Sequence, residues 1–197
     1  SALPVRVKSL PLDLENYSNF DEKAKEAIGW YGRIDILVNN GGISQRAFAK
    51  DTDISVDKRI MDINYTGTVA LTKAVLPHFI ERKQGHIVVT TSIVGKIGTP
   101  LRSTYAASKH ALHGFFDSLR AEVYHDNIDV TLICPGYVTT NVSMNALTGD
   151  GSAQQSMDKA TANGINPNRF AKLMAKAIAK KKQEAYIAGA KEKLGVY

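Results

Sequence analysis

Hydrophobic residues along this chain occur in two alternating arrangements. Short apolar runs rich in β-branched residues are separated by longer stretches in which apolar residues recur every three or four positions. A short run predicts a buried strand, and the longer repeat predicts a helix with one buried face. Strands that alternate with helices are typical of a parallel sheet, so we predict an α/β fold.

The expected elements follow one another along the whole chain. Predicted strands occupy residues 5–14 (leading into a loop), 34–40, 86–92, 128–134 and 185–189. Predicted helices occupy residues 18–31, 55–83, 103–126 and 170–182. Segment 141–167 is polar and rich in small residues, which predicts a mobile substrate loop or lid with one short helix. A length of 197 residues indicates a single domain, 1–197.

Polar and small residues gather directly after four of the predicted strands. Asp13 follows the first strand, and Ser92 follows the third. The segments NNGG (39–42) and Pro135–Gly136 follow the second and the fourth. Each could be an ordinary turn residue. Ligands of open parallel sheets bind beyond the carboxyl ends of the strands, so four such ends in succession predict a binding site there.

The stretch YAASK, residues 105–109, places Tyr105 and Lys109 four positions apart on a predicted helix. Residues at this spacing share one helix face. We therefore expect the Lys109 ammonium to lower the pKa of the Tyr105 phenol, because a nearby cation favours the ionised form. Such a phenol could exchange a proton with an alcohol or carbonyl oxygen at neutral pH. The spacing alone is also compatible with a surface tyrosine and a solvated lysine.

The sequence resembles the short-chain dehydrogenase/reductase family over nearly its whole length. The matching segments are LDL at 12–14, NNGG at 39–42, DINYTG with Asn64, TTSIVGKIG with Ser92, YAASK at 105–109, and PGYVTT at 135–140. The resemblance implies a single Rossmann-like domain with a doubly wound parallel sheet. It also implies an NAD- or NADP-dependent oxidoreductase that interconverts a secondary alcohol and a carbonyl of a small molecule.

The resemblance assigns a role to each matching residue. Tyr105 would be the general acid/base, and Lys109 would lower its pKa and hold the nicotinamide ribose. Ser92 would bind the substrate oxygen beside Tyr105, and Asn64 would hold a water of a proton relay. The implied contacts of NAD or NADP are Asp13 and Leu14 at the adenine, Asn40 and Gly41 at the adenosine ribose, Tyr105 and Lys109 at the nicotinamide ribose, and Pro135, Gly136, Val138 and Thr140 at the carboxamide.

One family motif is missing from this chain. No G-x-x-x-G-x-G segment occurs, although such a turn normally receives the pyrophosphate of the cofactor. In the family's strand order 3-2-1-4-5-6-7, two strands lie between those predicted here at 5–14 and 34–40. A sheet without them would expose two long backbone edges. We therefore expect roughly 40–60 preceding residues, the size of a βαβ unit and its extension, to belong to the working protein.

Charge and composition narrow the possible partners. The formal net charge of +6 arises in residues 168–197, where eight Lys/Arg face two Asp/Glu, while the remainder balances at 17 of each. A solvated helix face explains this better than nucleic-acid binding, because interleaved aromatic residues and a recognition motif are lacking. The single Cys134 permits no intrachain disulfide and is expected to pack inertly. Without a membrane-span or signal pattern, we expect a cytoplasmic protein.

Two further expectations complete the hypothesis. We expect no metal site, because the five histidines show no ligand spacing. The resemblance implies a homodimer or homotetramer that pairs through the helices at 55–83 and 103–126. The alternative to an enzyme is a binding or scaffold protein that keeps the fold without hydride chemistry. Reduced-nicotinamide binding would distinguish the two hypotheses.

Overall fold

The computed structural model describes residues 6–189 and residue 192. Val5, Lys191 and Lys193, which belong to the predicted first strand and the basic tail, lie outside the described residues. A parallel sheet with the strand order β1-β2-β3-β4 forms the centre of the fold. Its strands are β1 (Ile36–Asn39), β2 (Gly85–Thr90), β3 (Ile128–Pro135) and β4 (Glu184–Ile187). The predicted α/β class is confirmed.

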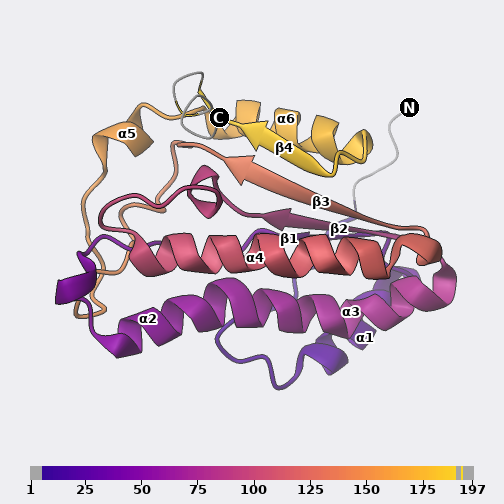
Figure 1. The fold of residues 1–197 in the computed structure, drawn as a ribbon. Coiled ribbons are helices and arrows are strands. Elements are labelled where there is room, and N and C mark those ends of the chain that lie inside the picture. The colour runs from indigo at the N-terminus through magenta and orange to yellow at the C-terminus, as the bar shows by residue number, and fades with distance from the viewer. Residues whose placement is uncertain (1–5, 190–191, 193–197) are drawn as a thin grey trace.

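Helices cover both faces of this sheet (Figure 1). The helices of the described residues are α1 (Phe20–Tyr31), α2 (Ile54–Met61), α3 (Thr68–Arg82), α4 (Ser103–Glu122), α5 (Lys159–Ala162) and α6 (Pro167–Ala179). Of these, α1, α3 and α4 pack on one face of the sheet and α6 packs on the other (Figure 1). Ile87 and Leu132 belong to the core formed with α1, α3 and α4. Val88 and Ile133 belong to a second core with α6. Successive strand residues point to opposite faces, so strands buried on both faces read as continuous apolar runs.

The helix predicted over 55–83 is divided in the structure. A π-helical segment, η2 (Asp62–Gly67), separates α2 from α3. Within it, the Asn64 side chain is fully buried and forms hydrogen bonds in both directions with the backbone of Ile43. These bonds tie the π segment to the loop after β1, which contains Ile43. Hydrophobic spacing does not predict the π segment, because it is only six residues long and lies between two stretches whose apolar residues recur at helical intervals.

The strand predicted over 5–14 is wrong for the described residues. Residues 6–13 have no regular structure, and a turn follows at 14 and 15. A strand needs a neighbour for its backbone hydrogen bonds, and within the described part of the chain none pairs with this segment. Val7 is accordingly 82% exposed. Across the described residues β1 is an edge strand, with Ile36 and Val38 exposed to 47% and 44%.

The predicted substrate loop, 141–167, is tied to the rest of the fold by two isolated β-bridges and by further hydrogen bonds, among them one from the Asp53 amide to the Gly149 carbonyl. Leu147 forms a parallel bridge with Gln45, and Ile165 forms one with Val138. The short helix expected within the loop is α5. Among the described residues, the structure has no helix that combines the length and the apolar character needed to cross a membrane.

Candidate active site

A cavity of about 400 Å³ lies beyond the carboxyl ends of β1, β2 and β3. Its walls include most of the residues that the sequence placed near a cofactor or a reacting oxygen. These are Asn40, Gly41, Ser92, Tyr105, Lys109, Pro135, Gly136, Val138 and Thr140. The sheet brings them together because parallel strands present their carboxyl ends along the same border.

A second cavity, of about 280 Å³, adjoins the first and shares Ser92 and Tyr105 with it. Most of its remaining wall is apolar, with Ile93, Val94, Ile97 and Val142 among its residues. A ligand in either cavity can therefore reach the same two hydroxyl groups. This arrangement suits a reaction between a cofactor in one cavity and a small molecule in the other.

Tyr105 and Lys109 lie on the same face of α4, as their spacing predicts. The Lys109 Nζ atom lies 5.7 Å from the centroid of the Tyr105 ring and donates a hydrogen bond to the Thr90 carbonyl at 2.9 Å. The Lys109 side chain is buried. Burial lowers the pKa of Lys109 to about 8, because an ammonium group loses hydration there. Lys109 can therefore gain and lose a proton in the range where many enzymes work.

The pKa of Tyr105 departs from the expectation. Burial raises it above the ordinary value, and this effect outweighs the hydrogen bond with Ser92 and the charges of Arg102 and Arg46, which lower it. Lys109 is not among the groups that lower it. The predicted lowering by Lys109 is therefore wrong for this structure. The physical reason is desolvation, which penalises the phenolate more than its neighbours favour it.

Asn64 lies behind the cavity rather than in its wall. Its Nδ2 donates to the Ile43 carbonyl at 2.9 Å and to the Ser108 hydroxyl at 3.0 Å, and its Oδ1 accepts from the Ile43 amide at 2.8 Å. A methyl group on Gly42 would lie 3.0 Å from Asn64 Oδ1 and 3.6 Å from Lys109 Nζ. The absence of a side chain at Gly42 thus keeps this approach to Lys109 open.

Ser92 stands where β2 ends and the short helix η3 (Ile93–Gly95) begins. Its hydroxyl accepts a hydrogen bond from the Val94 amide at 3.3 Å. The preceding Thr91 is buried and donates to the Ile133 carbonyl at 3.0 Å. A methyl group on Gly95 would lie 3.1 Å from the ring of His113. Both flanks of Ser92 are therefore packed against the interior.

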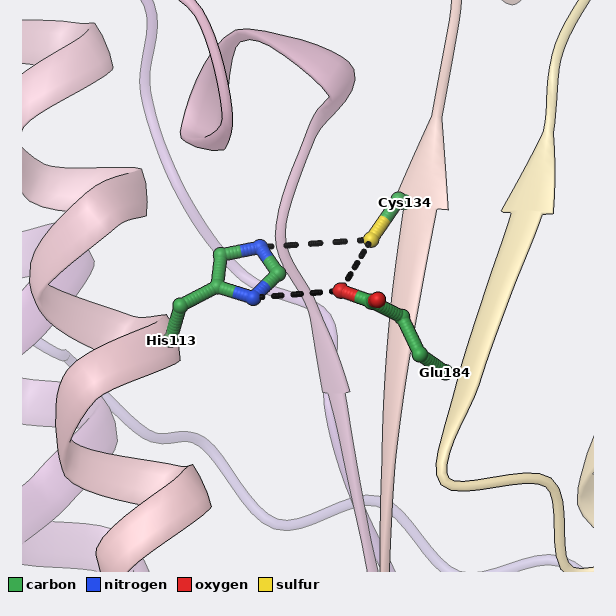
Figure 2. Close-up of side chains that lie close together, drawn as sticks. All are labelled: His113, Cys134 and Glu184. Atoms are coloured by element: carbon green, nitrogen blue, oxygen red, sulfur yellow. Dashed lines mark hydrogen bonds and ion pairs between the residues drawn. The ribbon is translucent and has the colours of Figure 1, made fainter. Parts of the chain in front are cut away.

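Beneath this turn, His113, Cys134 and Glu184 converge from α4, β3 and β4 (Figure 2). The Cys134 thiol donates to Glu184 Oε1 at 3.5 Å, and its sulfur lies 3.9 Å from His113 Nε2. His113 Nδ1 lies 3.3 Å from the same carboxylate oxygen without the alignment of a hydrogen bond. Sequence spacing gave no sign of this cluster, because its residues come from three separate elements.

The charges of this cluster favour a structural interpretation. Burial lowers the pKa of His113 to about 4 and raises that of Cys134 to about 12, so both groups are neutral at pH 7. The Lys96 Nζ atom lies 2.8 Å from Glu184 Oε1 and already balances the carboxylate. A metal cation would compete with this ammonium for the same oxygen. The inert packing expected for Cys134 agrees with its burial and raised pKa.

The residues expected at the adenine lie beside the cavity but do not line it. Asp13 is exposed, and its Oδ1 accepts a hydrogen bond from the Glu15 amide at 2.9 Å. Leu14 packs against the loop after β1, with its Cδ1 atom 2.6 Å from where a methyl group on Gly41 would lie. The glycine at position 41 therefore leaves room for the Leu14 side chain.

Arg46 and Arg102, which line the smaller cavity, and Asp158, which pairs with both, gave no signal in the sequence. Arg46 donates to Asp158 through Nε at 2.8 Å and also through its terminal nitrogen. Arg102 lies 3.7 Å from the same carboxylate and donates to the Tyr137 hydroxyl at 3.2 Å. The Arg46–Asp158 pair joins segments 112 positions apart, so no local pattern could have revealed it.

Comparisons with known proteins agree with this geometry. Residues 1–151 match the family described as short chain dehydrogenase. "Dehydrogenase/reductase SDR family member 7B" of Xenopus laevis is 49% identical over 185 residues, which cover 94% of this chain and 57% of that protein. The chain thus spans less than two thirds of the length of that relative.

Solved structures give the same result. A short-chain dehydrogenase from Streptomyces avermitilis is similar with a TM-score of 0.78 and 26% identity, over 95% of this chain and 73% of that one. A gluconate 5-dehydrogenase from Burkholderia cenocepacia, in complex with NADP and tartrate, matches 67% of this chain and 52% of its own, with a TM-score of 0.65 and 28% identity. With the strand-end cavity and the Ser92, Tyr105 and Lys109 side chains in its wall, the chain belongs to the short-chain dehydrogenase/reductase family of oxidoreductases.

Proposed function

We propose that this protein interconverts a secondary alcohol and a carbonyl compound with NAD or NADP, and that Tyr105 is the general acid/base. The observation that carries the proposal is the shared wall of the two cavities. Ser92 and Tyr105 face both, and Lys109 lies in the larger one. Apolar residues form most of the wall of the smaller one, together with Arg46, Arg102 and Glu192. The larger cavity would take the nicotinamide half of the cofactor, and the smaller one would take the substrate.

The chain's own residues fit the nicotinamide half of the cofactor. Gly42 has no side chain and lines the larger cavity together with Lys109. The Lys109 ammonium has hydrogen-bond donors for ribose hydroxyls beyond the one used on Thr90. Pro135, Gly136 and Val138 add a further part of the wall, at the carboxyl end of β3 and in the segment after it. When bound, NAD(P) supplies or accepts the hydride, and the protein supplies position and proton transfer.

The proton chemistry rests on three side chains. In the direction of reduction, the Tyr105 hydroxyl gives its proton to the carbonyl oxygen as negative charge develops there, and Ser92 stabilises that oxygen by a hydrogen bond. Arg102 and Arg46 favour the phenolate that remains. Lys109 then returns a proton to Tyr105, a transfer suited to its pKa of about 8. We assign Asn64 the role of holding a water that connects Lys109 with solvent.

The test is a Tyr105→Phe variant of the full-length protein, assayed on a panel of ketones and secondary alcohols with both NADH and NADPH. Turnover should fall by roughly 10³-fold or more, because the general acid/base is removed. Cofactor affinity, measured by reduced-nicotinamide fluorescence, should change little. Tyr124→Phe is the matched control, since Tyr124 is 75% exposed and remote from the cavities. Undiminished turnover of Tyr105→Phe would end the proposal.

Pairing of copies through α2–α3 and α4 is part of the same proposal. Sedimentation of the full-length protein would test it independently of activity.

A further inference from the structure

The first turn of α4, which carries Tyr105, is capped by a residue from another part of the chain. The residue at the N-cap position, Arg102, makes no side-chain cap hydrogen bond. Gln45 Oε1 instead accepts hydrogen bonds from the backbone amides of Thr104 at 3.0 Å and of Tyr105 at 3.3 Å. The first backbone amides of a helix have no hydrogen-bond acceptor within the helix, so an acceptor from another segment stabilises the start of the helix.

The orientation of the Gln45 amide group follows from its surroundings. The side chain is fully buried. Its Nε2 donates to the Thr52 hydroxyl at 3.2 Å, and that hydroxyl donates in turn to the Phe48 carbonyl at 2.9 Å. With the amide reversed, its NH₂ group would face the two helix amides, which are donors as well. Only the observed orientation pairs all of these groups.

The backbone around Gln45 is held on both sides. Ile43 is fixed by the two hydrogen bonds with Asn64. Leu147 of the substrate loop donates to the Ser44 carbonyl at 2.9 Å and accepts from the Arg46 amide at 2.8 Å. Gln45 therefore connects the π segment, the substrate loop and the start of α4. A side chain with such anchoring can transmit a fixed position to the helix that it caps.

We propose that Gln45 is a positioning residue for Tyr105, which caps the catalytic helix from the loop after β1 and thereby fixes where the phenol lies. The inference rests on the proposed function of Tyr105, but the cap itself is independent of it. Gln45 is absent from the walls of both cavities, so it acts through Tyr105 rather than on a ligand. Its effect on catalysis should be large, because small displacements of a reacting group reduce rates by as much as about 100-fold.

Two substitutions in the full-length protein separate the cap from the bulk of the side chain. Gln45→Met keeps the length of the side chain but removes the acceptor. Gln45→Glu keeps an acceptor and adds a negative charge. Gln84→Met is the control, because Gln84 is exposed, directly precedes β2 and lines neither cavity. Amide hydrogen exchange at residues 103–106, turnover, cofactor affinity and the pH profile are then measured for each protein.

Gln45→Met should lose exchange protection at Thr104 and Tyr105, while the amide of Ala106 keeps its protection through its bond to the Arg102 carbonyl. Its kcat should fall roughly 10- to 100-fold with cofactor affinity within about twofold of the wild type. Gln45→Glu should keep the protection. It should also move the alkaline limb of the kcat/KM profile upward by roughly half a pH unit or more, because a nearby negative charge raises the pKa of the phenol.

Unchanged protection of Thr104 and Tyr105 in Gln45→Met would overturn the cap. Normal kcat in that variant, or a loss of protection spread evenly over the protein, would overturn the positioning role. If Gln45→Met does not fold, the inference is tested by Gln45→Glu alone. An unshifted pH profile of that variant then counts against the inference. Wild-type turnover in Tyr105→Phe would instead remove the proposed function, while the exchange data would still report on the cap.

Discussion

The residues around Tyr105 line the larger cavity, and segment 6–19 reaches its wall only through Leu14 at Gly41. Different forces hold the two regions. Tyr105 and Lys109 stand on a helix whose start is capped, and buried hydrogen bonds of Asn64 and Gln45 fix the loop beside them. Segment 6–19 lacks regular structure and is mostly exposed. Its main link with the loop after β1 is Leu14, which packs beside Gly41 and Gly67.

The two regions differ in how they are held, and they also differ in proposed role: the residues around Tyr105 serve proton transfer, and segment 6–19 serves cofactor binding. The groups proposed for proton transfer are held by contacts inside the described fold, so their positions follow from packing. The residues proposed for the adenine depend on a few contacts of a segment that otherwise faces water. Changes in the first region should alter turnover and stability together. Changes near the second should alter cofactor affinity alone.

The largest effect should come from Lys109→Met in the full-length protein. We expect turnover to fall by about 10³-fold, because Tyr105 loses the group that returns its proton. Stability at pH 7 should rise by about 1–3 kcal/mol, since the pKa of about 8 shows that burial disfavours the ammonium. Urea unfolding and steady-state kinetics measure the two effects. Lys73→Met, on an exposed lysine of α3, is the control.

The pH dependence of the wild type gives a second readout of the same residue. Between pH 8 and 10 the unfolded chain holds the Lys109 proton more tightly than the folded protein does, so the free energy of unfolding should rise with pH. Above pH 10 the raised pKa of Tyr105 acts in the opposite direction. Lys109→Met should lack the rise. A variant that is less stable at pH 7 and keeps the rise would contradict the role of burial.

A smaller effect, on stability at acidic pH, is expected for His113→Gln. The pKa of His113 is lowered to about 4 by burial and by the charge of Lys96, against the opposing influence of Glu184. As the pH falls from 6.5 to 4, His113 becomes protonated in the unfolded chain but stays mostly neutral in the folded protein. Wild-type stability should therefore fall by on the order of 3 kcal/mol from this group.

Glutamine does not titrate, so His113→Gln should retain more of its pH 7 stability at pH 4.5 than the wild type does. Urea unfolding at pH 7, 5.5 and 4.5 provides the comparison. His125→Gln is the control, because His125 is exposed. If His113→Gln and the wild type lose stability equally, the buried neutral histidine is not what limits the fold in acid.

The sequence predicted the regular elements and most of the cavity wall, because both depend on local patterns. β2 and β3 read as short runs rich in β-branched residues, and the YAASK spacing placed Tyr105 and Lys109 on one face of α4. The prediction of a strand at 5–14 was wrong because a strand forms only when it can pair with a neighbouring strand, and an apolar run does not show whether such a neighbour exists. The predicted lowering of the pKa of Tyr105 was wrong for a related reason. Desolvation of the phenol depends on everything that surrounds it, whereas the sequence spacing identifies only one neighbour, Lys109.

Contacts between distant segments were out of reach for the same reason. Gln45 caps a helix 59 positions away, and Arg46 binds a carboxylate 112 positions away. The cluster of His113, Cys134 and Glu184 joins three elements. None of these residues has a distinctive local pattern, because glutamine, arginine and histidine are ordinary surface residues in most sequences. Their roles become visible only when the fold has brought them together.

The smallest effects should come from two glycines beside Leu14. A methyl group on Gly67 would overlap the Leu14 carbonyl oxygen, whereas one on Gly41 would lie 2.6 Å from the end of the Leu14 side chain, which can rotate away. Because segment 6–19 is weakly held, Gly67→Ala should displace it instead of the core. We expect stability to change by less than about 1 kcal/mol while cofactor affinity falls roughly 10-fold.

Gly41→Ala should change the affinity by about twofold or less, because only a flexible side-chain end must move. Fluorescence titration with NADH and NADPH, together with urea unfolding, measures both variants. Equal losses of affinity would mean that the Leu14 backbone does not anchor the segment. A large loss of stability in Gly67→Ala would mean that segment 6–19 is held as firmly as the residues around Tyr105, and the contrast between the two regions would then disappear.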